Sequence, residues 1–156
     1  MSYSLARQLL SNPIIKETNW VWGTKEDQER YMAIWLRDKF QCVYCDRDML
    51  ESYDTHYWFS HIDHLLPRSY EKYKELQNVK WNRVLSCCSC NGLKKDFDPD
   101  SESKLYVQGS LTTSDANREF WLTKARDFVT ALRDARTKHF ELEKALLRSV
   151  QLNEGE

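Results

Sequence analysis

The chain has 156 residues, 41% of them hydrophobic, and its six Trp, eight Tyr and six Phe provide enough apolar bulk for one buried core. Its 23 basic and 24 acidic side chains give a formal net charge of -1, which argues against strong autonomous binding to nucleic acid through a basic surface. No apolar run approaches the length of a membrane span, and the N-terminus lacks a signal-like apolar stretch. We therefore expect a cytoplasmic protein with no membrane partner.

Residues 1–41 are predicted to form an N-terminal helical extension. Its first helix is expected over Ser4 to Leu10, because a proline that disfavours helical continuation follows closely. The stretch from Ser11 to Gly23 is predicted to be a loop, which Trp20 and Trp22 could hold against the core.

A second helix in this extension is marked by a capping pattern. Thr24 followed by Asp27 resembles an N-cap, in which a short polar side chain accepts a hydrogen bond from the first helical turn. Apolar residues then recur at helical spacing up to Phe40, namely Tyr31, Ile34 and Trp35. We expect this helix to deliver the chain directly to the first of five cysteines.

Short strands and one short helix are predicted in the central region, residues 42–97. Aromatic and β-branched residues favour a strand from Tyr57 to Ile62, and a second strand is expected from Asn82 to Cys87. A long loop from Leu65 to Trp81 separates them. A short helix is expected from Asn91 to Phe97, so the predicted order is strand, loop, strand and helix.

Four of the five cysteines form two C-x-x-C pairs, Cys42 with Cys45 and Cys87 with Cys90. In a reducing compartment such pairs are typical of zinc ligands rather than of a disulfide framework. Four thiolates close a tetrahedral shell with no position left for water, so we expect a structural Zn²⁺ site. Cys88 could replace Cys87, but Cys87 repeats the spacing of the first pair. Cys88 is then most simply a small buried residue.

Residues 98–156 are predicted to form a C-terminal helical region. After a polar loop that ends near Ser114, a long helix is expected to run to about Val150 without Gly or Pro. A heptad-like seam follows this helix through Trp121, Ala125, Phe128, Leu132, Ala135, His139, Leu142 and Leu146. The seam has two interpretations, packing against the protein's own N-terminal helices or an interface with a protein partner or a second copy.

Polar residues of a second kind lie within and beside the frame of cysteines. Asp63 and His64 lie in the run IDHLLPR, whereas Asn82 and Asn91 begin and end the run NRVLSCCSCN. Together with the cysteine pairs, these motifs resemble the zinc-bearing branch of the HNH endonuclease family over roughly residues 40–97. The resemblance implies an α+β fold. A small ββα-metal core with a four-cysteine zinc site would be flanked by the N-terminal helices and the long C-terminal helical segment.

The resemblance also implies a catalytic role for each of these four side chains. His64 would be the general base that takes a proton from the attacking water, and Asn82 would orient the His64 ring. Asp63 and Asn91 would hold a divalent ion that stabilises charge on the phosphate and on the departing 3′ oxygen. The expected reaction is hydrolysis of a DNA phosphodiester bond to a 5′ phosphate and a 3′ hydroxyl.

The residue types at this second site bear on the ion and on the alternatives. Asn91 stands where many members of the family have histidine, and two oxygen ligands favour Mg²⁺ or Mn²⁺ over catalytic Zn²⁺. Three of these residues also have a simpler interpretation, with Asp63 and His64 as a turn or a surface pair and Asn91 as an N-cap. His61, two residues before Asp63, either contacts phosphate or merely packs.

Basic residues in and beside the long loop either contact DNA phosphates or form a solvated charged face: Arg68, Lys72, Lys74, Lys80, Arg83, Lys94 and Lys95.

From the resemblance we expect a metal-dependent DNA endonuclease, the cutting subunit of a prokaryotic or phage restriction or anti-phage defence system. The alternative is a zinc-stabilised module that binds nucleic acid or protein without catalysis. The intact set of Asp63, His64, Asn82 and Asn91 favours the enzyme.

Overall fold

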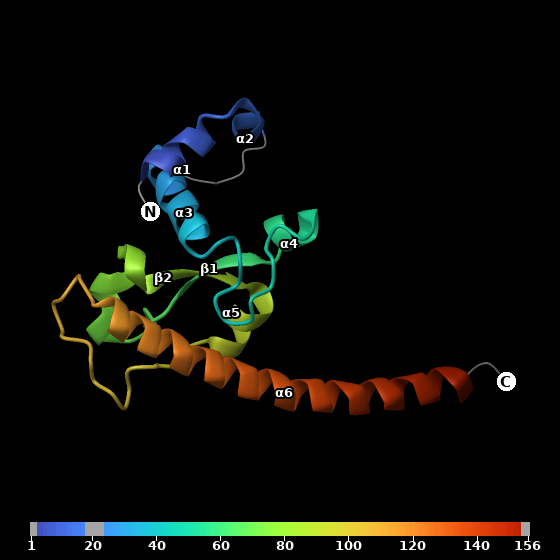
Figure 1. Cartoon of the computed structure of the whole chain (residues 1–156). Helices are drawn as coiled ribbons and strands as arrows, with labels where there is room; N and C mark the ends of the chain where they lie inside the picture. The colour runs from blue at the N-terminus through green and yellow to red at the C-terminus, as the bar shows by residue number, and fades with distance from the viewer. Residues whose placement is uncertain (1–2, 18–23, 154–156) are drawn as a thin grey trace.

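The computed structural model describes residues 3–17 and 24–153 and has the expected α+β architecture. A two-stranded antiparallel sheet has the N-terminal helices on one side and one very long helix on the other (Figure 1). The elements are α1 (Tyr3–Leu10), α2 (Pro13–Glu17), α3 (Lys25–Arg37), α4 (Tyr53–Tyr57), β1 (Ser60–His64), the 3₁₀ helices η1 (Glu71–Asn78) and η2 (Lys80–Asn82), β2 (Arg83–Cys87), α5 (Cys88–Lys94) and α6 (Asp115–Asn153). The predicted anchors Trp20 and Trp22 lie outside the described residues. Within the described part of the chain, no helix combines the length and apolar composition that a membrane crossing needs.

The predicted start of α3 is confirmed by its cap. Thr24 Oγ1 accepts a hydrogen bond from Asp27 N at 3.2 Å, and Thr24 N donates to Asp27 Oδ2 at 3.2 Å. The helix ends at Arg37 rather than at Phe40, because Lys39 and Phe40 adopt φ angles of 55° and 56°. These two residues turn the chain into the first cysteine pair.

The helix α2 occupies part of the segment predicted as a loop. Pro13 opens it at a position where the missing N–H is not needed, and Asn12 Oδ1 accepts a hydrogen bond from Ile14 N at 3.0 Å. Nearby, Ala6 of α1 and Met32 of α3 share a small buried cluster. The N-terminal helices therefore pack on one another beside the main core.

The hairpin of β1 and β2 places the candidate catalytic residues. Antiparallel pairing sets Asp63 opposite Val84 and His64 opposite Arg83. Because side chains alternate along a strand, Asp63 and His64 point to opposite faces of the sheet. Neighbouring residues of one motif thus have different surroundings.

One helix, α4, overlaps only the first residue of the predicted strand, and two 3₁₀ helices lie in the predicted loop. Residues Tyr53–Tyr57 form α4, because Ser52 Oγ accepts a hydrogen bond from Thr55 N at 3.1 Å and starts a helical turn. As a result β1 begins at Ser60 rather than at the start of the predicted strand. Between the strands, η1 and η2 fill much of the predicted loop, and Asn82 ends η2 instead of beginning β2.

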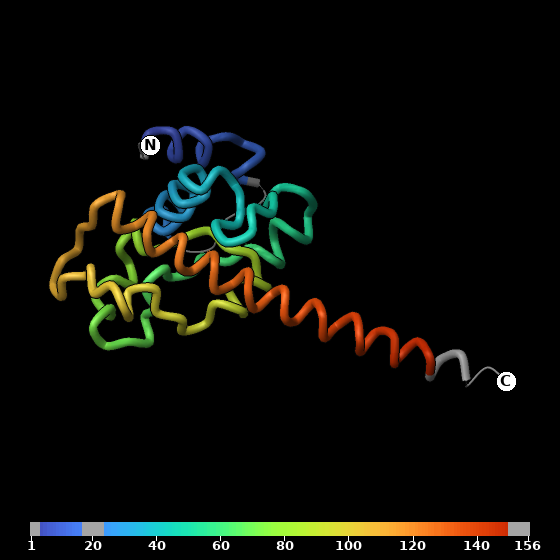
Figure 2. Tube along the Cα trace, turned by 60° about the horizontal axis from the view of Figure 1, so that its bottom comes forward, coloured from blue at the N-terminus to red at the C-terminus, as the bar shows by residue number. Residues whose placement is uncertain are grey.

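The main core joins α3, the hairpin, α5 and the first half of α6. Trp121 and Ala125, which begin the predicted seam, are buried in this core. The second half of α6 runs on beyond the core (Figure 1 and Figure 2), and there Leu142 is 71% and Leu146 66% exposed. The seam therefore packs against the protein's own core only over its first half.

Candidate functional site

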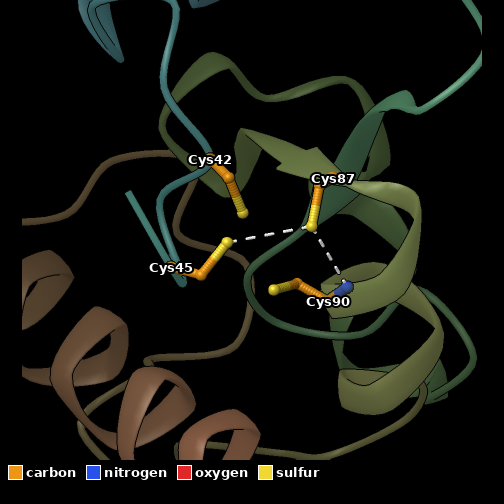
Figure 3. Close-up of side chains that lie close together, drawn as sticks. All are labelled: Cys42, Cys45, Cys87 and Cys90. Atoms are coloured by element: carbon orange, nitrogen blue, oxygen red, sulfur yellow. Dashed lines mark hydrogen bonds between the residues drawn. The ribbon is translucent and has the colours of Figure 1, made fainter. Parts of the chain in front are cut away.

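The four cysteines of the two C-x-x-C pairs converge in the structure (Figure 3). The Sγ atoms of Cys42, Cys45, Cys87 and Cys90 all lie within 4.8 Å of one another, and those of Cys45 and Cys87 are 3.9 Å apart. Thiolates bound tetrahedrally at about 2.3 Å from Zn²⁺ lie about 3.8 Å apart, so small movements let the sulfurs share one ion. The expected convergence of four thiols is confirmed, and this donor set fits structural zinc.

Backbone geometry brings each pair of thiols to this position. In the first pair, Val43 N donates to Leu85 O at 2.9 Å, which docks the turn onto β2, and Asp46 closes the turn with a φ of 56°. In the second pair, Cys87 caps α5 and accepts a hydrogen bond from Cys90 N at 3.4 Å. Amide donors of this kind favour the thiolate, which is the form that binds metal.

A nearby cation also supports bound thiolates. Arg133 of α6 donates a hydrogen bond to the Cys90 sulfur. Four thiolates around Zn²⁺ carry a net charge of about -2, which this guanidinium partly offsets. The cluster contains Cys87 and not Cys88, as the spacing predicted. Cys88 is exposed, so the expectation that it is buried is wrong.

Asp63 is 8% exposed, and both of its carboxylate oxygens have partners. Oδ2 accepts a hydrogen bond from Tyr44 OH at 2.7 Å and lies 3.5 Å from Lys94 Nζ, while Oδ1 accepts from His64 N at 2.7 Å. Tyr44 lies in the turn of the first cysteine pair, and Lys94 is the last residue of α5. The candidate metal ligand Asp63 is thus positioned in part by the zinc-binding turn itself.

Lys94 is one of the basic residues for which the sequence allows a contact with phosphate, but the structure gives it another role. Its side chain is fully buried, and its ammonium donates to His64 O at 2.8 Å as well as pairing with Asp63. Burial lowers the pKa of Lys94, and the Asp63 carboxylate opposes that change. A divalent ion on Asp63 would share the carboxylate with this ammonium.

His64 is half-buried at the end of β1, and one hydrogen bond sets its tautomer. Nε2 lies 2.8 Å from Gln77 O, and since a carbonyl only accepts, Nε2 carries the proton and Nδ1 carries the lone pair. Burial lowers the pKa of His64, although the bond to Gln77 O acts in the opposite sense. The imidazole is therefore neutral at neutral pH, as a general base must be before it takes a proton.

Asn82 is fully buried, and its amide binds two backbone segments rather than the His64 ring. Oδ1 accepts from Leu66 N at 2.7 Å, and Nδ2 donates to Leu66 O at 3.1 Å and to Leu76 O at 3.4 Å. These bonds clamp the segment after β1 to η1, the helix in which Gln77 accepts from His64. The expected ring contact is thus replaced by indirect positioning through the backbone.

Asn91 lies inside α5, because Cys87 is the N-cap, so the interpretation of Asn91 as an N-cap is wrong. Its Nδ2 lies 3.4 Å from Nδ1 of His61. His61, which has no assigned role, therefore contacts Asn91, the second candidate metal ligand. His61 and Asp63 share one face of β1. Among the described residues, the thiol cluster is the only convergence of three or more His, Cys, Asp or Glu donors. A second ion would therefore depend on water or substrate for most of its shell.

A cleft of about 560 Å³ opens beside His64, and no carboxylate of the described residues lines it. Of the basic residues predicted near the site, Arg68 and Arg83 line the cleft, whereas Lys72 pairs with Asp98 at 2.9 Å. The other lining side chains are histidines, aromatic residues, neutral polar residues and one isoleucine. The charge of the cleft thus suits an anionic ligand.

The sequence matches no family model and no curated protein. The structure contains an antiparallel hairpin whose two strands both contact α5, with the candidate catalytic residues on β1, at the end of η2 and on α5.

The contact between the zinc-binding turn and Asp63 is testable. Tyr44→Phe is expected to destabilise the chain by about 1.5–3 kcal/mol, because it removes a buried hydrogen bond to a carboxylate. Burial and the nearby Asp63 raise the pKa of Tyr44, so its hydroxyl remains a donor. Urea denaturation measures the change, with Tyr53→Phe as the matched control at an exposed tyrosine. Equal stability of Tyr44→Phe and the parent chain would contradict the assignment.

Proposed function

We propose that this chain is a metal-dependent DNA endonuclease of the HNH type with a structural Zn²⁺ ion. The observation that carries the proposal is the contact of 2.8 Å between His64 Nε2 and Gln77 O, which leaves Nδ1 as the proton acceptor of the ring. This ring borders a cleft that no described carboxylate lines, which suits a phosphodiester substrate. A zinc ion on the four cysteines would stabilise the backbone that carries these residues.

Each site residue has one role in the proposed hydrolysis. His64 Nδ1 would take the proton of a water molecule that attacks phosphorus in line with the departing 3′ oxygen, and solvent water would protonate that oxygen, which leaves a 5′ phosphate and a 3′ hydroxyl. Asp63 and Asn91 would hold a Mg²⁺ or Mn²⁺ ion, while Tyr44 and Lys94 keep the Asp63 carboxylate in place. Because Asp63 and His64 leave β1 on opposite faces, we place the phosphate at the end of β1, where that ion, when bound, would supply stabilisation of negative charge on the phosphate and leaving oxygens.

The second half of α6 is proposed to bind a protein partner or a second copy of the chain. Its exposed apolar side chains are Phe140, Leu142, Leu146 and Leu147. One catalytic centre cuts one strand, so a double-strand break needs two centres or two visits. Recruitment through α6 would fit a cytoplasmic restriction or anti-phage defence system, which is an assignment by analogy.

A zinc-stabilised binding module without catalysis is the second candidate. The observation that favours it is the buried Lys94, which lies 3.5 Å from Asp63 and already balances its charge. In that case the cleft would bind nucleic acid, and the Asp63 carboxylate would serve the fold alone.

A cleavage assay separates the two candidates. The zinc-loaded full chain is incubated with supercoiled plasmid, and separately with single-stranded circular DNA, in the presence of Mg²⁺ or Mn²⁺. We expect at least one substrate to be opened, with ends that a DNA ligase rejoins without further treatment. If both substrates stay intact with either ion, the endonuclease proposal is refuted and the binding module is favoured.

A further inference from the structure

Arg83 is a buried cation with no ion pair among the described residues, although it is near enough to Asp27 to add to the hydrogen bonds from Thr24 in lowering the pKa of that carboxyl. It is only 9% exposed, its Nε has no hydrogen-bond acceptor, and it belongs to none of the ion pairs of the described residues. Its guanidinium lies over the Tyr31 ring, 4.8 Å from the ring centre. A largely buried charge without a close anion is costly, so Arg83 is suited to a ligand that supplies one.

The position of Arg83 identifies the kind of anion. Arg83 lies directly opposite His64 in the hairpin register, and both side chains line the same cleft. Arg68 lines it as well, together with the neutral polar side chains of Ser60 and Asn78. Guanidinium groups bind phosphate oxygens through paired hydrogen bonds, so this part of the cleft is suited to a phosphate beside the proton acceptor.

Tyr57 of the cleft belongs to a run of exposed aromatic residues that supplies a second kind of contact. Four large aromatic residues between 53 and 59 are exposed, Tyr53 by 65%, Tyr57 by 38%, Trp58 by 67% and Phe59 by 48%. Tyr57 lines the cleft, and its ring centre lies 4.7 Å from that of Tyr53. We call these four residues the aromatic patch. Exposed rings beside a phosphate site are the arrangement on which unpaired bases stack.

The net charge of the chain favours a single strand over a duplex as the ligand of the cleft. Duplex binding depends on many phosphate contacts, and this chain has a net charge of -1 with 24 acidic residues. Stacking on aromatic rings needs unstacked bases and contributes about 1–3 kcal/mol per base. Two arginines with an aromatic patch therefore suit a short single strand better than a double helix.

We propose that the cleft binds single-stranded DNA, with one phosphate on the Arg83 guanidinium and adjacent bases stacked on the aromatic patch. This inference rests on the proposed endonuclease function, because the phosphate on Arg83 lies next to the one that His64 would attack. It assigns the substrate class of the site as an unpaired strand.

Fluorescence anisotropy tests the proposal without any cleavage. A fluorescein-labelled single strand of about 12 nucleotides and the duplex of the same sequence are titrated with the zinc-loaded full chain, with no added divalent ion. The single strand should bind about tenfold or more tightly than the duplex. Arg83→Met and Tyr57→Ala, which change two residues that line the cleft, should each weaken strand binding by about fivefold to 100-fold. Arg148→Met and Phe120→Ala, at exposed positions on α6, are the matched controls and should bind like the parent chain.

Thermal melting separates a binding role of Arg83 from a structural one. If Arg83 serves the ligand, Arg83→Met removes an unpaired buried charge, and the melting temperature stays the same or rises. A lower melting temperature together with unchanged strand affinity would overturn the proposal. Equal affinity for strand and duplex would overturn it too, while leaving the endonuclease proposal to the cleavage assay. Conversely, selective strand binding by a chain that cuts neither DNA substrate would refute the endonuclease alone.

Discussion

Replacing His64 with alanine is expected to slow DNA cleavage by about 10²–10⁴-fold, the usual contribution of a general base. The structure gives the reason, because Nε2 donates to Gln77 O and Nδ1 is the nitrogen that can accept the proton of the attacking water. The initial rate of strand cleavage at saturating Mg²⁺ or Mn²⁺ measures the effect. Losing the bond to Gln77 O should cost about 1 kcal/mol, so the variant remains folded during the assay.

The matched control for this variant is His139→Ala. His139 is an exposed histidine on α6 and does not line the cleft, so its replacement should leave the cleavage rate at that of the parent chain. Binding of the labelled strand, measured in parallel, separates a catalytic loss from a binding loss. If His64→Ala cleaves DNA at the rate of the parent chain, His64 is not the general base, even though the preparation contains nuclease activity.

The parts of the fold that were predicted correctly are those that depend on short-range chemistry. A capping box needs only Thr24 and Asp27 at the right spacing, and the start of α3 followed from it. The long helix α6 followed from a stretch without Gly or Pro. The thiol cluster followed from two pairs of cysteines whose spacing suits one tetrahedral ion.

The parts that were missed depend on tertiary burial. Lys94 and Lys95 are adjacent in sequence, yet Lys94 is buried against Asp63 while Lys95 is exposed at the end of α5. Nothing in the sequence distinguishes the two before the helix is docked. Asn82 was expected to hold the His64 ring. Its amide instead forms hydrogen bonds with the backbone of the segment after β1 and with the backbone of η1.

One missed element had a recognisable local signal. The aromatic residues from Tyr57 onward favour a strand, yet Ser52 and Thr55 form a cap that starts α4. The shift in the start of β1 matters for the site, because α4 carries Tyr53 and Tyr57 to the edge of the cleft. Attention to capping residues ahead of an aromatic run would have found this helix.

The four-cysteine cluster and the candidate catalytic site are linked through single side chains. Tyr44 lies between Cys42 and Cys45 and donates to Asp63, while α5 carries both Cys90 and Lys94. Loss of zinc would therefore release both the turn that carries Tyr44 and the helix that carries Lys94 from the Asp63 carboxylate.

Cys90→Ser, or removal of zinc by a chelator, is expected to unfold the central region of the chain. Structural zinc contributes about 10–16 kcal/mol of apparent binding energy in zinc-finger peptides, which is comparable to the whole stability of a domain at about 5–15 kcal/mol. Cys90 is completely buried in the main core, so its replacement also leaves a polar hydroxyl without a metal partner. Circular dichroism follows the unfolding, and elemental analysis of the parent chain should find about one zinc per chain.

Cys88→Ser provides the control, because Cys88 precedes the buried ligand Cys90 by two positions but is exposed and lies outside the cluster. Its melting temperature and zinc content should match those of the parent chain, since an exposed thiol-to-hydroxyl change alters stability by no more than about 0.5 kcal/mol. A zinc-free parent chain with a cooperative fold would refute the structural role of the four thiols. Equal loss of zinc from Cys88→Ser and Cys90→Ser would instead show that Cys88 also binds the ion, which its position outside the cluster argues against.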